Sequence, residues 1–361
     1  MALFNRQLCL ESRPMGVPSE DNIRLRCTSL CRPGPGQVLI QNLYLSMDPA
    51  IRGWMSEKPS YMAPIELGEP VRGSTLGRVV ESAHPDFQIG DIAFGLACNA
   101  WEDFSLTPAE QLVRIPANPP FPLSYYLSIF SPVGLTPYFG VLDIAKAKPG
   151  DTMLISAAAG AVGSLAGQIA RIAGCRTVGL VGSDEKCSWI VDELGFDGAI
   201  NYRSCTDLTS AIAEACPEGV DSYFDNVGGE VLDAALLNMN NFGRIVFCGA
   251  IAQYNNEDAV PGPFNYWQIL ARSLTVRGYM APEFEGRFAE AREALGRWMS
   301  EGRLVFAEEV VDGLENTVEA FSRLFSGANK GKLMVKLRDI SEPPPTIDQI
   351  REAVAQELSH A

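Results

Sequence analysis

The first third of the chain has the hydrophobic pattern of short strands. Up to about residue 125, apolar runs at 38–47, 77–80 and 92–96 are separated by turn residues such as Pro33-Gly34-Pro35-Gly36 and Gly90-Asp91. Runs of this length between Gly and Pro turns predict a compact all-β domain.

From Pro132 onward the pattern changes to strands that alternate with helices. The apolar runs lie at 152–156, 177–181, 199–202, 222–224 and 244–248. This alternation predicts an α/β fold with a doubly wound parallel sheet covered by helices. We expect a helix to begin at Thr136-Pro137, with Thr136 as cap, a last strand over 274–280, and a helix through 288–299.

These changes of pattern define the expected domains. We place a first β-rich domain at 1–130, the parallel sheet at 131–303 and a return to the first domain at 304–340, with strands at 308–311 and 332–337 and a helix over 317–325. Residues 341–361 read as a Pro-rich spacer and an amphipathic helix, which either covers a subunit contact or is a loosely attached terminus.

Residues 151–186 read as one strand-turn-helix-strand unit with a phosphate site in its turn. The turn contains Ala158-x-Gly160-x-x-Gly163, a dinucleotide fingerprint whose first glycine is replaced by alanine. Gly160 would let the backbone approach a pyrophosphate, and Gly163 would let the helix pack closely on the strand. Taken alone, the pattern fits an ordinary strand-helix turn equally well.

The end of the second strand indicates which dinucleotide would bind. Gly182-Ser183 stands where an acidic residue would meet a free ribose 2′-hydroxyl, and Lys186 follows shortly after Asp184 and Glu185. A small pocket beside a cation favours NADP(H) over NAD, although a solvated lysine is the alternative for Lys186. The loops 226–229 and 249–254 leave later strands at the same edge and should face the cofactor.

Composition limits the classes of molecule that the protein is expected to bind. The formal net charge of −15 repels nucleic acids and anionic membranes, so a small molecule is the expected partner. Nine cysteines without a Cys-x-x-Cys, and only two histidines, predict neither a disulfide framework nor a metal site. The first residues show no secretion signal and no stretch reaches transmembrane length, so we expect a cytoplasmic protein.

Several motifs in order resemble one enzyme family over about residues 5–337. They are LSMDPAIRGWM (45–55), GLTPYFG (134–140), AAAGAVGS (157–164), GSDEK (182–186), FDNVGGE (224–230), CGAIAQYN (248–255) and GANKGK (327–332). The chain is similar to the zinc-independent, NADP-dependent branch of the medium-chain dehydrogenase/reductases, in the group of leukotriene B4 dehydrogenase/prostaglandin reductases, 2-alkenal reductases and curcumin reductase. The resemblance implies a GroES-like domain and a Rossmann domain.

The resemblance also implies the roles of individual residues. Gly160, Ala161, Val162 and Gly163 would hold the pyrophosphate, and Lys186 and Tyr202 would contact the 2′-phosphate. The rest of the cofactor path would be lined by Thr136, Asn226, Cys248, Gly249, Ala250, Ile251, Tyr254, Tyr279, Met280 and Asn329. Zinc-dependent relatives have Gly-His-Glu where this chain has Gly73-Ser74-Thr75, and a four-cysteine lobe that it lacks, so we expect no zinc.

A site without a metal or a catalytic histidine suits hydride delivery assisted by one hydrogen-bond donor. Reduction of an α,β-unsaturated aldehyde or ketone by NADPH fits, with Tyr254 donating to the carbonyl oxygen; alternatively, Tyr254 only stacks on the nicotinamide. A quinone oxidoreductase and a non-catalytic NADPH-binding regulatory protein remain alternatives. Ala50 replaces a tyrosine found in many relatives, which suggests a roomier substrate pocket. Relatives often form homodimers through edge strands, for which 274–280 is the candidate.

Overall fold

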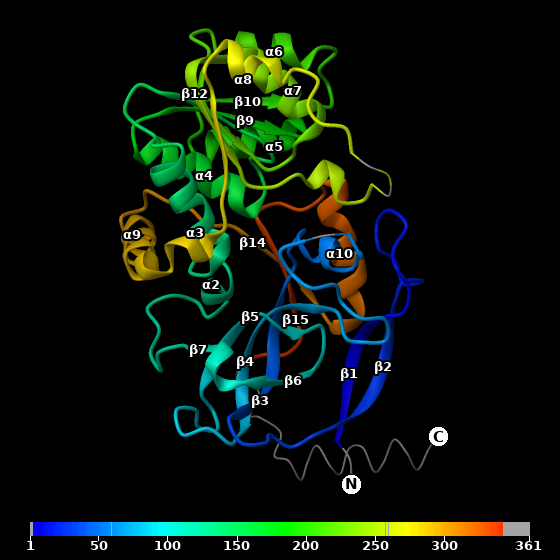
Figure 1. The fold of residues 1–361 in the computed structure, drawn as a ribbon. Coiled ribbons are helices and arrows are strands. Elements are labelled where there is room, and N and C mark those ends of the chain that lie inside the picture. The colour runs from blue at the N-terminus through cyan, green and yellow to red at the C-terminus, as the bar shows by residue number, and fades with distance from the viewer. Residues whose placement is uncertain (1–2, 59, 257, 259, 342–361) are drawn as a thin grey trace. The chain divides into compact units, whose positions relative to one another are not determined.

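A computed structural model describes residues 3–58, 60–256, 258 and 260–341 of the chain (Figure 1). The chain divides into two compact units. Of the described residues, those within 3–127, Val310–Ala328 and 333–341 belong to one unit, and those within Ser128–Glu309 and Asn329–Lys332 belong to the other. The short piece Asn329–Lys332, which is part of the motif GANKGK (327–332), belongs to the second unit, and we call it the return segment. The helix expected in the tail lies outside the described residues.

The first unit is rich in β-structure. Strands β1 (Leu3–Leu10) and β2 (Ile23–Leu30) form a two-stranded antiparallel sheet. A larger sheet has the order β14-β15-β3-β4-β5-β7, and β6 pairs with β3. Its strands are β3 (Gln37–Ser46), β4 (Arg72–Ser82), β5 (Ile92–Ala100), β6 (Phe104–Pro108), β7 (Leu112–Arg114), β14 (Glu308–Asp312) and β15 (Lys332–Lys336).

Helices close the core of this unit. They are α1 (Ile51–Trp54), η1 (Ala109–Gln111), α2 (Ser124–Leu127), η5 (Leu314–Asn316) and α10 (Thr317–Ser326). Helix α10 buries Val318, Phe321 and Leu324, and the Phe321 ring meets Trp101 edge to face at 5.1 Å between ring centres. The strands and the helix expected between 308 and 337 are therefore confirmed.

The second unit contains a parallel sheet of six strands in the order β10-β9-β8-β11-β12-β13. The strands are β8 (Thr152–Ile155), β9 (Arg176–Val181), β10 (Gly198–Asn201), β11 (Val220–Asp225), β12 (Met239–Phe247) and β13 (Thr275–Gly278). The helices are α3 (Pro132–Phe139), the π-helix η2 (Gly140–Ile144), α4 (Ala161–Ile172), α5 (Asp184–Asp192), α6 (Leu208–Ala215), α7 (Gly229–Asn238), η3 (Ile251–Gln253), α8 (Trp267–Ala271), η4 (Ala281–Arg287) and α9 (Phe288–Ser300).

The expected fold class is confirmed by this order. Counted along the chain, the strands lie in the sequence 3-2-1-4-5-6, the doubly wound arrangement, with the reversal between β8 and β11. All four residues of β8 are buried, as a central parallel strand requires. Ligands of such sheets bind where the strand order reverses, at the carboxyl ends of the strands.

Two expected elements differ from the structure. Helix α3 begins one turn before Thr136-Pro137: Ser131 is its cap, Pro132 is its first residue, and Thr136 and Pro137 lie inside it. The strand expected over 274–280 is shorter, because only β13 (Thr275–Gly278) pairs with β12. Tyr279 and Met280 lie beyond its end. None of the described helices combines the length and apolar character needed to cross a membrane.

Candidate functional site

The turn between β8 and α4 is built to bring backbone amides to an anion. Gly160 caps α4 without any side-chain hydrogen bond, so Ala161, Val162 and Gly163 form an open first turn. A Cβ on Gly163 would lie 2.3 Å from the carbonyl oxygen of Ala157, so a larger residue would force the turn apart. Ala157 itself has a left-handed backbone (φ 49°). This tight turn, whose helix start is capped by no side chain, fits the pyrophosphate of a dinucleotide.

The return segment supports the turn from outside. Gly331 donates its N–H to the carbonyl of Ala159 at 2.8 Å and forms a parallel bridge with Gly160. Gly331 has φ of 68°, and a Cβ there would lie 2.3 Å from the carbonyl oxygen of Ala307. The segment therefore holds the phosphate turn through backbone contacts that only glycine accommodates.

Tyr202, one of the two residues predicted to contact a 2′-phosphate, lies beyond the tip of β9. Tyr202 follows β10 and donates its N–H to Val181 at 3.0 Å, which brings its side chain beside Gly182. A Cβ on Gly182 would lie 3.0 Å from the Tyr202 hydroxyl oxygen. Tyr202 is 37% exposed, so it is not the buried strand tyrosine that the local pattern alone would indicate.

Lys186, the other predicted residue, lies in the first turn of α5, the helix that follows β9. Ser183 caps this helix by accepting the Lys186 N–H at 3.3 Å. The ammonium donates to the carbonyl of Asn329 at 2.5 Å, which joins it to the return segment. Burial lowers the pKa of Lys186, while the nearby Glu309 opposes that shift. The half-buried lysine is therefore not the freely solvated side chain of the alternative interpretation.

The acidic neighbours of Lys186 do not occupy the position of a ribose-binding acid. The Asp184 carboxylate accepts a hydrogen bond from the side chain of Asn201 at 2.8 Å. The end of β9 thus presents Gly182 with donors around it, an arrangement that suits a phosphate better than a ribose hydroxyl.

The loops after β11 and β12 are joined by hydrogen bonds to the tip of β8. The side chain of Asn226 donates to the carbonyl of Ser156 at 2.7 Å, and the carbonyl of Asn226 accepts the N–H of Ile251 at 3.1 Å. The buried carboxylate of Asp225 accepts the N–H groups of Val227 and Gly228, at 3.0 and 2.9 Å. Cys248 and Gly249 donate their N–H groups to the carbonyl of Asp225.

Tyr254 folds back over its own loop. Its hydroxyl oxygen accepts the N–H of Ala250 at 3.3 Å, and the missing side chain of Gly249 leaves room for it. That bond uses a lone pair, so the hydroxyl proton remains for an acceptor outside the loop. Burial raises the pKa of Tyr254 above its ordinary value of 10, so the hydroxyl is a donor at neutral pH.

The remaining predicted residues form a separate group beside α3. The Tyr279 hydroxyl donates to the carbonyl of Thr136. Tyr279 also lies against Gly140, where a Cβ would be 2.4 Å from its hydroxyl oxygen. Met280 is 43% exposed.

All predicted cofactor residues thus belong to the second unit, and most follow the carboxyl ends of its strands. The sequence did not single out Ser156 or Asp225, which organise the loops, because small or buried polar residues at strand ends carry no distinctive pattern.

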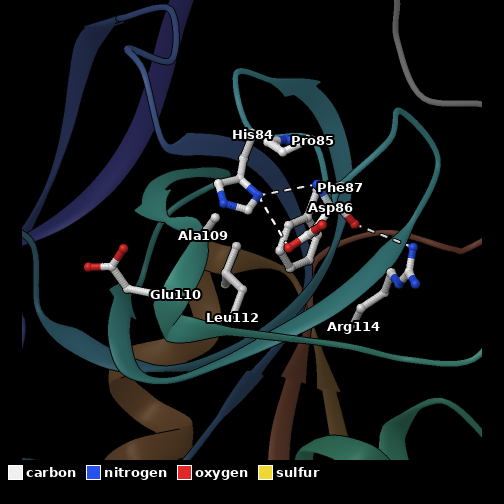
Figure 2. A pocket seen from close by; sticks show the side chains of 8 residues that line it. All are labelled: His84, Pro85, Asp86, Phe87, Ala109, Glu110, Leu112 and Arg114. Carbon is white, nitrogen blue, oxygen red and sulfur yellow. Dashed lines mark hydrogen bonds and ion pairs between the residues drawn. The ribbon is translucent and has the colours of Figure 1, made fainter.

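A surface hollow of about 640 Å³ lies in the β-rich unit (Figure 2). It is lined by His84, Pro85, Asp86, Phe87, Ala109, Glu110, Leu112 and Arg114. His84 accepts the N–H of Asp86 at 3.2 Å, as a turn residue would. The hollow shares no residue with the predicted cofactor site, so it does not carry the chemistry considered above.

Comparison with known proteins shows the family. Residues 6–115 match the model for the N-terminal domain of oxidoreductase, and residues 161–298 match the model for zinc-binding dehydrogenase. The NADPH-dependent curcumin reductase of Escherichia coli (strain K12) is 39% identical, over 92% of this chain and 97% of that protein. The chain belongs to the medium-chain dehydrogenase/reductases. The family resemblance found in the motifs is therefore confirmed.

Other members of the dehydrogenase/reductase family agree in length and fold. The NADP(+)-dependent 2-alkenal reductase of Nicotiana tabacum is 37% identical, over 92% of this chain and 97% of that protein. The crystal structure of CurA from Vibrio vulnificus in complex with NADPH superimposes with a TM-score of 0.87 at 36% identity, covering 92% of this chain and 99% of that one. The match to these reductases spans both units.

One family model is named for zinc, and the metal-binding residue types were therefore compared in space. Across the described ranges, no three His, Cys, Asp or Glu side chains lie together as a metal site would require. At Gly73-Ser74-Thr75, Thr75 is buried in a polar network: it donates to Asn42 at 2.7 Å and accepts from Asn99 at 2.6 Å.

Proposed function

We propose that this dehydrogenase/reductase is an NADPH-dependent reductase that delivers hydride to the β-carbon of α,β-unsaturated aldehydes and ketones. The observation that carries the cofactor choice is the tip of β9, where Gly182 replaces the ribose-binding acid and the Tyr202 hydroxyl lies beside it; Lys186 follows in the first turn of α5. The names of the relatives support both the cofactor and the substrate class, since they include an NADPH-dependent curcumin reductase and a 2-alkenal reductase.

In this proposal the chain binds the cofactor, orients the substrate and supplies a proton. NADPH, when bound, supplies the hydride. The first turn of α4 (Ala161, Val162, Gly163) holds the pyrophosphate by its free amides. The loops fixed by Ser156 and Asp225 fix the position of Tyr254, whose hydroxyl donates to the substrate's carbonyl oxygen as enolate charge develops there. Its raised pKa keeps that proton in place at neutral pH.

We propose that the reaction needs no zinc. The side chains at Gly73-Ser74-Thr75 are hydroxyls and a hydrogen atom, which are poor zinc ligands compared with histidine and carboxylate. The hydroxyl of Ser74 accepts the N–H of Ala97 at 3.1 Å, and Thr75 is bound on both sides. This position therefore serves the fold of the β-sheet.

We further propose a homodimer through the free edge of β13. All four residues of β13 are exposed, and β13 pairs with β12 on one side in the described sheet. The segment that leads into it exposes Phe264, Trp267 and Leu270, by 82%, 63% and 67%. An exposed strand edge beside apolar side chains is a ready interface. A cytoplasmic location stays a prediction.

The first experiment follows NADPH absorbance with a medium-chain 2-alkenal, a bulky enone and a quinone, in the wild type and in Tyr254→Phe. We expect reduction of the alkenal or enone, and a loss of about 10²-fold in turnover in Tyr254→Phe with the Kd for NADPH unchanged. Because burial raises the pKa of Tyr254 above 10, its contribution should not titrate between neutral pH and about pH 9.

The same assay separates the alternatives. Turnover of the quinone alone, insensitive to Tyr254→Phe, would indicate a quinone oxidoreductase. Tight NADPH binding without turnover of any acceptor would indicate a regulatory protein. A preference for the bulky enone that disappears in Ala50→Tyr would support a roomier pocket at Ala50.

A further inference from the structure

The order of the strands indicates where the nicotinamide half of the dinucleotide would lie. Strands β9 and β10 lie on one side of β8, and β11 and β12 lie on the other. A dinucleotide crosses the carboxyl edge of such a sheet with its pyrophosphate at the first turn, here the start of α4. Since the adenosine half is expected at the tip of β9, the nicotinamide half would lie over β11 and β12. The last residue of β11 is Asp225.

The side chain of Asp225 is a carboxylate without any exposed surface. Its Oδ1 accepts the N–H groups of Val227 and Gly228. The same oxygen accepts the hydroxyls of Tyr223, at 2.8 Å, and Ser156, at 3.4 Å. Burial raises the pKa of Asp225, and these hydrogen bonds oppose the shift. Because every partner of Oδ1 is a donor, the arrangement fits the ionised carboxylate.

No cation neutralises this charge in the part of the chain that the structure describes. The hydrogen bonds to Oδ1 come from neutral groups, and Oδ2 is buried without a partner among the same residues. The charge also reaches the loop after β12. Burial raises the pKa of Cys248 to about 12 and that of Tyr254 above its ordinary value, and the charge of Asp225 adds to both shifts. A ring bound against this loop would feel the same charge.

Hydride transfer changes the charge of such a ring. When the C–H bond of the reduced nicotinamide breaks, both electrons leave with the hydride for the β-carbon of the acceptor. The neutral ring of NADPH becomes the positively charged ring of NADP⁺, and the enolate oxygen takes its proton from Tyr254, as proposed above. A fixed negative charge near the ring favours the positively charged form and therefore the departure of the hydride.

We propose that the buried Asp225 carboxylate stabilises the positively charged nicotinamide of NADP⁺ and thereby promotes hydride transfer. This inference rests on the proposed function in taking NADPH as the hydride donor, but it does not depend on which acceptor is reduced. The competing explanation is that Asp225 only fixes the loops through its hydrogen bonds. That role would affect NADPH and NADP⁺ alike, whereas a charge distinguishes them.

The test compares the Kd values of NADP⁺ and NADPH, measured by calorimetry. In Asp225→Asn the side-chain oxygen can still accept the same hydrogen bonds, but the charge is lost. We expect the ratio of the Kd for NADP⁺ to the Kd for NADPH to rise about 10-fold. The affinity for adenosine 2′,5′-bisphosphate, which lacks the nicotinamide, should not change. Oxidation of NADPH in a single turnover should slow, and an unchanged rate would contradict the proposed effect on hydride transfer.

Tyr223→Phe is the matched control. The buried Tyr223 hydroxyl donates to Asp225, so this variant removes one of the hydrogen bonds and leaves the charge in place. The ratio of the two Kd values should stay at that of the wild type. Equal weakening of NADP⁺ and NADPH in Asp225→Asn, or the same rise of the ratio in Tyr223→Phe, would overturn the proposal.

The outcome is separable from that of the proposed reaction. If the protein reduces a quinone but no enone and Asp225→Asn still raises the ratio, the double-bond chemistry is removed and the role of Asp225 stands. If Asp225→Asn does not fold, the wild type decides. It should bind NADP⁺ at least as tightly as NADPH, and tighter binding of NADPH by about 10-fold or more would overturn the proposal.

Discussion

Glycines are required by close packing at several places in the second unit. At Gly163, Gly331 and Gly140 a Cβ would approach another atom to within 2.4 Å or less. The first two distances are to backbone carbonyls, which cannot turn aside as a flexible side chain can. The fingerprint glycine Gly163 is therefore required by packing, independently of any bound nucleotide.

Gly163→Ala tests this requirement. The added methyl group meets the Ala157 carbonyl at 2.3 Å, so the turn must open, and we expect a loss of about 1–3 kcal/mol in the free energy of unfolding. Weaker NADPH binding should accompany it, since the amides of the turn move. Chemical denaturation and fluorescence titration measure the two effects.

Gly286→Ala is the control, because a Cβ there has no neighbour within 4 Å. If Gly163→Ala were as stable as Gly286→Ala, the close packing of the turn would not matter to the fold.

Helix α3 begins at a different Ser/Thr-Pro pair from the one predicted, although the rule that such a pair starts a helix is correct. Ser131-Pro132 and Thr136-Pro137 both carry the signature of a helix start, within six residues of each other. The structure uses the first: the Ser131 hydroxyl accepts the N–H of Val133 at 3.3 Å and donates to the carbonyl of Ser128 at 2.7 Å. Thr136 lies within the helix.

Ser131→Ala should therefore lower the free energy of unfolding by about 1 kcal/mol, the usual cost of a lost cap. Thr136→Ala removes no cap and should cost less. Thermal or urea unfolding of both variants provides the comparison, and a larger loss in Thr136→Ala would contradict the observed start of α3.

The hydrophobic pattern located the strands of the parallel sheet but not all of their ends. β12 begins at Met239 rather than near Arg244, and β13 stops at Gly278, because pairing with neighbouring strands decides where a strand ends. Lys186 and Tyr202 are 16 positions apart in the sequence, and the parallel pairing of β9 with β10 places the segments that follow these two strands at the same edge of the sheet. Asn329 comes from still farther along: the motif GANKGK (327–332) implied its role, but the hydrophobic pattern did not place it in the second unit.

For the whole molecule, the net charge and the exposed apolar side chains have opposite effects on association with other proteins. The net charge of −15 opposes non-specific association. The exposed edge of β13 would offer a specific interface in spite of it, through backbone pairing and the apolar side chains of the preceding segment. A dimer of this kind should depend on a few residues at that edge.

Val276→Lys puts a charge at the centre of β13 and should convert the dimer to a monomer, measured by light scattering after gel filtration. Val17→Lys is the control, because Val17 and Val276 are both 45% exposed and only Val276 lies in the edge strand. NADPH binding should survive in both variants. A dimer that persists in Val276→Lys would place the interface elsewhere.

The return segment limits how the second unit can be exchanged between proteins. A transplanted fragment that ends near residue 309 leaves behind the glycine amide that pairs with Ala159 and the carbonyl that receives the Lys186 ammonium. A chimera of two family members can keep these contacts only if Asn329–Lys332 is transferred together with residues 128–309, or if the recipient protein has an equivalent segment. Because Asn329–Lys332 lies in the sequence between two pieces of the first unit, the second unit cannot be exchanged as one continuous segment without affecting the first.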